Sequence, residues 1–177
     1  MSDVVSNPNQ NPTSAAALAA AAEGTQIVIQ ADRDGTDDPT ITGSSTVFRD
    51  GVTPETGSFT GLRPGYSGDG YVDFGSNPGD TLTFTVNMAT AGRYDLSVRY
   101  ASNGFRPLDI GVNGAVSLEQ DFPTTDPDGD ALEEGFDHWL HKTLTVDLFA
   151  GENTITLAIP AGKTSGPNID RIEITEE

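Results

Sequence analysis

The sequence contains no cysteine. This absence excludes disulfide bonds, zinc–thiolate sites and a thiol nucleophile. A chain without cysteine also suits maturation outside the cell without oxidative help, and we expect an extracellular, secreted or cell-surface protein.

Basic residues are scarce, with nine Lys and Arg against 27 Asp and Glu, which gives a formal net charge of -18. Nucleic-acid partners require a basic footprint, so this class is excluded, and anionic membrane surfaces are disfavoured for the same reason. The excess of acidic residues has two interpretations. The first is that the charge keeps the protein soluble. The second is that some of the carboxylates bind divalent cations. We expect both, with most of the acidic side chains on the solvated surface.

Long hydrophobic runs are absent, and no stretch approaches transmembrane length. Residues 1–22 contain no Lys or Arg, so they do not read as a secretory signal peptide. Either export uses another signal, or the chain is part of a larger protein. Residues 1–25 are rich in Ser, Asn, Pro and Ala and have little to bury, which predicts a disordered, flexible leader or linker before a single domain over residues 26–177.

The domain lacks helix-like periodicity, and its 20 Gly and 11 Pro favour short strands joined by turns. Apolar and polar residues alternate with a period of two, which is typical of antiparallel sheets that share one core. Turn sequences such as Asn113-Gly114 separate the alternating runs. We predict an all-β fold, an antiparallel jelly-roll β-sandwich of roughly eight to ten strands. The clearest predicted strands are 27–31, 81–88, 93–100, 143–148, 154–159 and 168–174.

The last predicted strand carries an acid among apolar residues. Alternation places Asp170 on the same face as Ile172 and Ile174. A carboxylate on an apolar face must be paired, hydrogen-bonded or bound to a cation. One alternative is a salt bridge to Arg171 or Arg33, and the other is a metal ion.

The first predicted strand offers matching oxygen ligands. Gln30 and Asp32 are two residues apart, so their side chains point the same way. Strands near the two ends of a sandwich domain commonly lie close together, which would bring both residues near Asp170. Amide, carboxylate and backbone oxygens suit Ca²⁺.

Four segments occur in a characteristic order: Ile-Gln-Ala-Asp at 29–32, Gly-Tyr-Ser-Gly-Asp-Gly-Tyr-Val-Asp-Phe at 65–74, Ala-Gly-Arg-Tyr-Asp-Leu-Ser-Val-Arg-Tyr-Ala at 91–101, and Gly-Pro-Asn-Ile-Asp-Arg-Ile at 166–172. Together they resemble the family 35 and family 6 carbohydrate-binding modules over the chain from about Gln26 onward. The resemblance implies a galactose-binding-like jelly-roll with a structural calcium ion held by Gln30, Asp32 and Asp170. Where such modules more usually have Glu-Ala-Glu, this chain has Gln-Ala-Asp.

The same resemblance implies sugar binding at loops on one end of the sandwich. Carried over by position, the ligand-binding residues would be Tyr71, Trp139 and Asn168, with Asn103 and Arg106 at the rim. An aromatic face stacks on the C–H groups of a sugar ring, while an amide orients its hydroxyls. For two of these residues an alternative to sugar binding stays open. Tyr71 could be a core residue, and Asn168 could cap a turn.

The segment 122–141 reads as a long insertion containing Asp126-Pro127-Asp128-Gly129-Asp130. These alternating acids, followed by Glu133 and Glu134, indicate a second calcium loop or a merely solvated one. The order differs from that of an EF-hand loop.

Catalytic motifs are absent. The two histidines are spaced as His138-Trp139-Leu140-His141 without a His-Glu-x-x-His motif, and no Gly-x-Ser-x-Gly occurs. Only paired carboxylates leave glycoside hydrolysis open. The sequence therefore predicts a non-catalytic, calcium-stabilised carbohydrate-binding module that targets a secreted protein or enzyme to polysaccharide. The alternatives are a structural or adhesin spacer domain of a large surface protein and a small glycoside-active enzyme.

Overall fold

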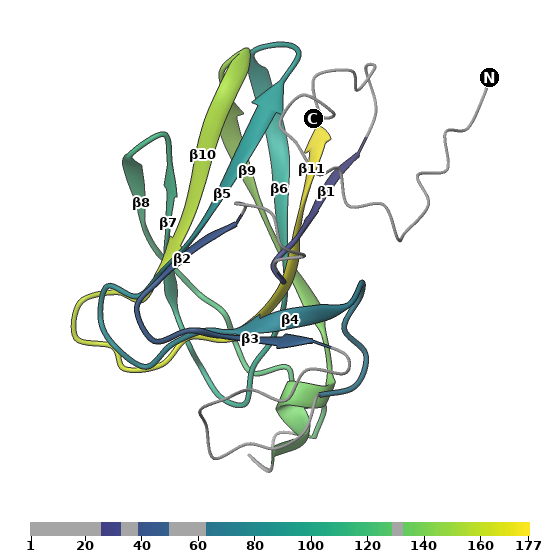
Figure 1. Cartoon of the computed structure of the whole chain (residues 1–177), viewed down its shortest axis with the longest axis vertical. Helices are drawn as coiled ribbons and strands as arrows, with labels where there is room; N and C mark the ends of the chain where they lie inside the picture. The colour runs from purple at the N-terminus through teal and green to yellow at the C-terminus, as the bar shows by residue number, and fades with distance from the viewer. Residues whose placement is uncertain (1–25, 33–38, 50–62, 129–132) are drawn as a thin grey trace, which may run out of the picture.

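The computed structural model describes residues 26–32, 39–49, 63–128 and 133–177. The predicted leader at 1–25 lies outside these ranges, as does Arg33. The described chain folds into two antiparallel sheets packed face to face (Figure 1). This is the predicted antiparallel β-sandwich of the jelly-roll type.

The strands divide between a six-stranded and a five-stranded sheet. The first, called sheet A, has the order β3-β4-β11-β6-β9, with β1 also paired to β11. The second, sheet B, has the order β2-β5-β10-β7-β8. The elements are β1 (Ile27–Gln30), β2 (Thr40–Thr42), β3 (Thr46–Arg49), β4 (Gly70–Asp73), β5 (Thr81–Met88), β6 (Gly92–Ala101), β7 (Leu108–Val112), β8 (Ala115–Gln120), the 3-10 helix η1 (Glu133–Asp137), β9 (Leu140–Leu148), β10 (Gly151–Ala158) and β11 (Asn168–Glu176).

The core lies between the sheets, where the alternating apolar side chains of both meet. In β5, Leu82, Phe84 and Val86 are fully buried, whereas the threonines between them are only partly buried. Leu96 and Val98 of β6 face them from sheet A with no exposed surface. The period-two pattern therefore places these strands as predicted, because burying one face fixes which side chains point inward.

Eleven strands are described instead of the predicted eight to ten. The sequence of 32–70 predicts a loop-rich segment, yet the structure places β2 and β3 there. These strands are only three and four residues long, which is too short for a clear alternating pattern. The turn at Asn113-Gly114 is confirmed, with φ values of 51° and 78°. Two successive positive φ angles fit the tight hairpin between β7 and β8.

Strand β11 is central to sheet A and contains an irregularity. It pairs with β1, β4 and β6, and its register with β6 shifts between Ile169 and Arg171. Asp170 is therefore the extra residue of a β-bulge. The prediction that Asp170 shares a face with Ile172 and Ile174 is wrong for this reason. Its carboxylate instead meets Arg99, which alternates with the buried Val98 and Tyr100 of β6.

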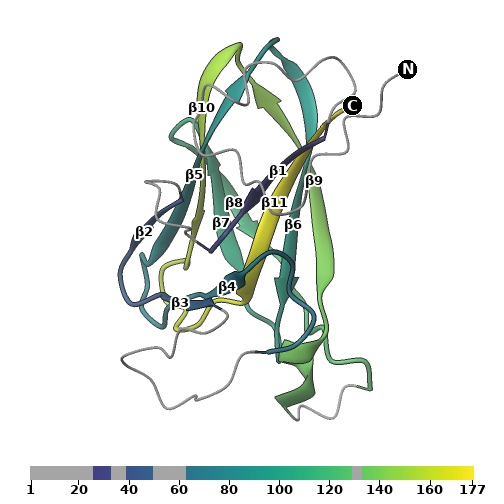
Figure 2. The same cartoon turned by 45° about the vertical axis from the view of Figure 1, so that its right-hand side comes forward.

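The loops that end several strands gather at one end of the sandwich. Both views place η1 there, below β3 and β4 and close to the start of β9 (Figures 1 and 2). The insertion predicted at 122–141 thus supplies η1 and leads into β9 at this end. No helix among the described residues is both long and apolar enough to cross a bilayer.

Candidate functional site

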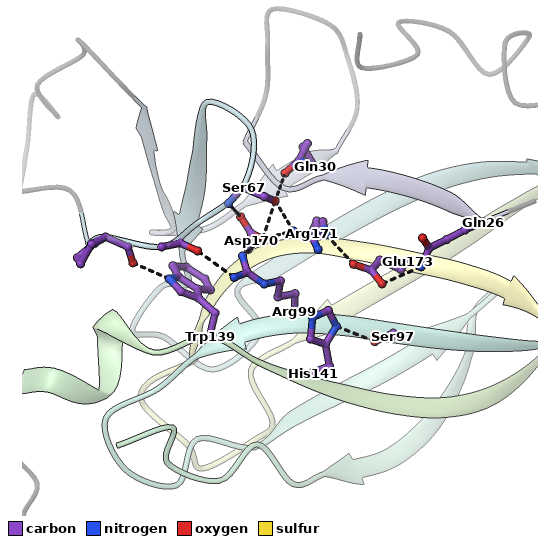
Figure 3. Close-up of polar contacts among 12 residues, drawn as sticks. Gln26, Gln30, Ser67, Ser97, Arg99, Trp139, His141, Asp170, Arg171 and Glu173 are labelled. Carbon is purple, nitrogen blue, oxygen red and sulfur yellow. Dashed lines mark hydrogen bonds and ion pairs between the residues drawn. The ribbon is translucent and has the colours of Figure 1, made fainter. Parts of the chain in front are cut away.

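Asp170 is the centre of a polar network on the outer side of sheet A (Figure 3). Its side chain is fully buried. Ser67 donates to it from its backbone N–H at 2.7 Å and from its hydroxyl at 2.8 Å. Arg99 and Arg171 donate to Oδ2 at 2.5 Å and 3.0 Å. The structure thus contains the salt bridge to Arg171 that the sequence left open as an alternative, with Arg99 as a second partner.

Asp32 is buried nearby, and its carboxylate lacks part of its hydrogen bonding. It is 3% exposed, and its Oδ1 accepts no hydrogen bond from any described residue. Burial raises its pKa to about 6, although Arg49, 3.9 Å from Oδ2, opposes that shift. A buried carboxylate with a free oxygen is unfavourable without a cation.

The side chain of Gln30 reaches the Asp170 network through Ser67. Its Oε1 accepts from the Ser67 hydroxyl at 3.3 Å, the same hydroxyl that donates to Asp170. The backbone N–H of Ala31 also donates to the carbonyl of Asp170 at 2.8 Å. The charge of Asp170 also contributes to the raised pKa of Asp32, so Gln30, Asp32 and Asp170 lie in one neighbourhood.

The chemistry of this neighbourhood suits a calcium ion only in part. The side chains of Gln30 and Asp32 offer oxygens, and the buried Oδ1 of Asp32 lacks a hydrogen-bond partner. Against a cation stand the guanidinium groups of Arg99 and Arg171, which already pair with Asp170, and that of Arg49 near Asp32. No group of three or more His, Cys, Asp or Glu side chains placed to hold a metal is found in the described ranges. A calcium site here would therefore depend on Asp32 together with the Gln30 amide and the Oδ1 of Asp170.

Trp139 lies just before β9 and joins that strand to the loop preceding β4. Its Nε1 donates to the carbonyl of Pro64 at 2.8 Å. The guanidinium of Arg99 lies 5.4 Å from its ring centroid, and Tyr71 meets it edge-on at 5.5 Å. Gly65, at φ +84°, approaches so closely that a Cβ would lie 3.2 Å from Cδ1 of Trp139. Trp139 is only partly exposed, and much of its ring contacts protein.

Tyr71 does not form a surface platform. It is 1% exposed and stacks on Phe48 with ring centroids 5.2 Å apart. Tyr66 covers it at 5.6 Å. Of the two alternatives, the structure favours packing over direct sugar contact, because Phe48, Tyr66 and Trp139 occupy the surroundings of its ring.

Asn168 and Asp73 are direct cross-strand partners at the loop end of sheet A. Such partners point to the same face. Asn168 is 4% exposed, and its Oδ1 has no hydrogen-bond partner within the described part of the chain. Burial raises the pKa of Asp73, whereas the positive charges of Arg106 and Arg63 lower it in part. This strand end thus presents two adjacent oxygen acceptors.

Two guanidinium groups flank the same aromatic ring beside these acceptors. Arg106 lies 4.8 Å and Arg63 lies 5.3 Å from the ring centroid of Phe136 in η1. Arg106 also donates to the carbonyl of Gly166 at 2.9 Å, and Arg63 lies 3.5 Å from Oδ1 of Asp137. We call the residues Arg63, Asp73, Arg106, Phe136, Asp137 and Asn168 the end-loop cluster.

Phe105 is the exposed aromatic residue next to this cluster, with 56% of its surface accessible. It lies in the loop after β6, between Asn103 and Arg106. Asn103 is partly buried against Gly135, where a Cβ would lie 2.9 Å from the Asn103 Cα. Sequence reasoning missed Phe105 although it named Asn103 and Arg106 on either side of it. An isolated aromatic residue in a polar, Gly-containing loop was the available signal.

The loop proposed to bind a second calcium ion is described only in part. The backbone N–H of Asp128 donates to Oδ1 of Asp126 at 3.2 Å, and Asp126 is largely buried. Gly129 and Asp130 lie outside the described ranges, and so do the side chains of Glu133 and Glu134. The second calcium loop stays a prediction.

Comparison with known proteins identifies relatives of the domain. A family model described as delta endotoxin (Endotoxin_C) matches residues 41–175. The exo-β-D-glucosaminidase of Amycolatopsis orientalis is 35% identical over 121 residues, covering 67% of this chain and 11% of that protein. The next two curated relatives, an isomaltosyltransferase and a 1,6-α-glucosyltransferase of Sporosarcina globispora, are covered over 10% and 8% of their length. This chain thus spans only a small part of the curated relatives it matches.

Solved structures of family 35 carbohydrate-binding modules share the fold. A module from Paenibacillus barcinonensis superposes with a TM-score of 0.66 and 29% identity, over 85% of this chain and 99% of that one. A second, from Clostridium thermocellum, has a TM-score of 0.64 and 26% identity, over 84% and 98% of the two chains. Each of the two known modules is spanned almost completely, so the likeness extends over a whole module.

Proposed function

Since the chain belongs to the delta endotoxin (Endotoxin_C) family and has the fold of the family 35 carbohydrate-binding modules, we propose that it is a non-catalytic module that binds polysaccharide. The observation that carries this proposal is the buried, unpartnered Oδ1 of Asn168 at the loop end of sheet A. A buried amide oxygen without a partner is unfavourable, and a ligand hydroxyl would satisfy it.

The surrounding residues supply the other contacts that a sugar needs. Phe105 offers an exposed aromatic face for stacking on axial C–H groups. Arg106 links the loop of Phe105 to the segment entering β11, because it donates to the Gly166 carbonyl at 2.9 Å. In this proposal Phe105 stacks on the ring, Asn168 accepts from a hydroxyl, and Asn103 lies at the rim.

Trp139 and Tyr71 have a supporting role in this account. The Trp139–Pro64 hydrogen bond holds the loop before β4 against β9, and Tyr71 packs beneath both. Positioning of this kind matters because loops bind precisely only when a rigid scaffold supports them.

A calcium ion is the second part of the proposal. Gln30, Asp32 and the Oδ1 of Asp170 would hold it where β1 meets β11. Its chemistry there is structural: it would neutralise the buried Asp32 carboxylate and fasten the first strand to the last. In this proposal the ion takes no direct part in the sugar contacts.

We further propose that the module directs a larger secreted protein or enzyme to extracellular polysaccharide. The coverage of 11% of the exo-β-D-glucosaminidase supports this arrangement, because the matching segment is a small part of that carbohydrate-active protein. A single small site binds weakly, so attachment to further domains or sites would strengthen retention.

Affinity electrophoresis in gels containing neutral or acidic polysaccharides tests the binding. The chain is expected to be retarded by at least one polymer, and Asn168→Ala is expected to lose at least about tenfold in affinity. Asn87→Ala, which changes an outward residue of β5 on sheet B, is the matched control. Retardation by no polymer would favour the spacer alternative, and release of reducing sugar by the purified chain would favour an enzyme.

A further inference from the structure

The charged groups of the end-loop cluster balance one another. Arg63 and Asp137 form an ion pair at 3.5 Å. Arg106 and Asp73 stabilise each other's charged forms, since each shifts the pKa of the other toward ionisation. Two guanidinium groups thus face two carboxylates, and the cluster offers no surplus charge to an ionic ligand.

The hydrogen bonding of the end-loop cluster is not balanced in this way, because some of its acceptor oxygens have no hydrogen-bond donor. The Oδ1 atoms of Asn168 and Asp137 accept no hydrogen bond within the described part of the chain. Asp73 is the cross-strand partner of Asn168 and adds its carboxylate on the same face of sheet A. A ligand that satisfies these oxygens must donate hydrogen bonds, as sugar hydroxyls do.

The arginines do not present an open fork to a carboxylate. Arg106 donates to the Gly166 carbonyl and packs on Phe136, which Arg63 also faces. Bidentate carboxylate recognition requires two parallel N–H donors directed at the ligand. The same two positive charges oppose a divalent cation at this position.

We propose that the end-loop cluster selects uncharged saccharides over uronates, and that Asp73 is the residue that determines this specificity. The inference rests on the proposed function, since it names the class of glycan that the module takes. Neutral sugar hydroxyls donate to Asp73 and Asn168, whereas the carboxylate of a uronate meets the Asp73 carboxylate and is repelled.

Isothermal titration calorimetry with matched polymers tests the selection. Galactan is compared with polygalacturonate, mannan with polymannuronate, and glucan with polyglucuronate, at equal monomer concentration. The neutral member of any pair that binds is expected to bind at least about tenfold more tightly. Equal or tighter binding of a uronate would overturn the selection while leaving glycan binding intact. Binding to none of the polymers would overturn the proposed function itself.

The variant Asp73→Asn tests the assigned residue. It removes the charge and keeps an oxygen acceptor, so the affinity ratio of uronate to neutral polymer is expected to rise about tenfold. Asp147→Asn, an exposed residue near the opposite end of β9, removes the same charge and is expected to leave the ratio unchanged. An equal rise in both variants, or none in Asp73→Asn, would overturn the role of Asp73.

A measurement on the unaltered chain covers the case in which Asp73→Asn does not fold. Salt screens repulsion between partly exposed charges, and the Debye length falls from roughly 20 Å at 20 mM NaCl to about 4 Å at 500 mM. The ratio of the affinity for the neutral polymer to that for the uronate is therefore expected to fall over this range. Discrimination that stays constant over this range would contradict a charge-based selection.

Discussion

Arg99 of β6 and Asp170 of β11 form a 2.5 Å ion pair beneath the Ser67 loop, and the Asp170 carboxylate has no exposed surface. Ser67 and Arg171 complete its partners. This network fastens the loop before β4 to the two central strands of sheet A, and so supports the end of the molecule where the candidate site lies.

Arg99→Met is expected to destabilise the domain by about 3 kcal/mol, because it removes one partner from a buried charge. Arg93→Met is the control, since Arg93 and its partner Glu177 are both largely exposed, and its cost should stay below about 1 kcal/mol. Urea denaturation gives both values. Equal, small effects of the two changes would show that the Asp170 network contributes little to stability.

Much of the sandwich could be predicted because alternation constrains which face is buried. The strand at 81–88 was placed correctly, and its inward residues are those of the pattern. The predicted strands 93–100, 143–148 and 168–174 differ from β6, β9 and β11 by at most three residues at either end. The short strands β2 and β3 were missed because three or four residues carry too little periodicity.

The site was harder to predict, since its geometry depends on non-local pairing. The bulge at Asp170 arises from the register of β11 against β6, which no local pattern contains. Tyr71 follows Gly70 and the exposed Phe105 follows Gly104, so each is an aromatic residue directly after a glycine. Only the packing of Phe48 and Tyr66 around Tyr71 distinguishes the buried ring from the open one.

Substitution of Phe105 is expected to affect glycan binding, whereas substitution of Trp139 is expected to affect stability. Phe105→Ala should lower glycan affinity at least about tenfold and change stability by less than about 0.5 kcal/mol, since the ring is 56% exposed. Trp139→Phe should lower stability by about 1–2 kcal/mol, because the Pro64 carbonyl loses its donor. Thermal melts and affinity electrophoresis on both variants separate the two effects. A loss of binding confined to Trp139→Phe, without loss of stability, would contradict these roles.

The hydrogen bonds of Asp80 predict that the stability of the domain falls in acid. Burial raises its pKa, but donors including the Ser44 hydroxyl at 2.6 Å and the Asn77 N–H at 3.2 Å outweigh burial, and the pKa is lowered. The folded state therefore binds fewer protons than the unfolded state. The stability that Asp80 contributes is fully present above its unfolded pKa of 3.8. This stability is lost as the pH falls through the lower pKa of Asp80 in the folded state.

Asp80→Asn is expected to cost about 2 kcal/mol at pH 7 and progressively less as the pH falls below about 4. Denaturation of both forms between pH 2 and pH 7 measures the difference. A difference that stays constant across this range would show that Asp80 is not held as a carboxylate by these donors.

Calcium is expected to stabilise the domain through Asp32. At a free concentration one hundred times the Kd, binding would add about 2.7 kcal/mol to the free energy of unfolding. Asp32→Asn should abolish this increase, and in chelator it should be no less stable than the unaltered chain, because the buried carboxylate has no partner for Oδ1. Melting in calcium and in chelator provides the comparison. An unchanged melting temperature on adding calcium would remove the ion from this account.

The most direct measurement is a nuclear magnetic resonance titration of the labelled chain with an oligosaccharide from a polymer that retards it. We predict that the amide signals that shift most belong to Phe105, Arg106 and Asn168, with those of sheet B strands β5 and β10 unaffected. Shifts concentrated on sheet B, or saturating sugar that leaves the Asn168 signals unchanged, would contradict a glycan site at the end loops.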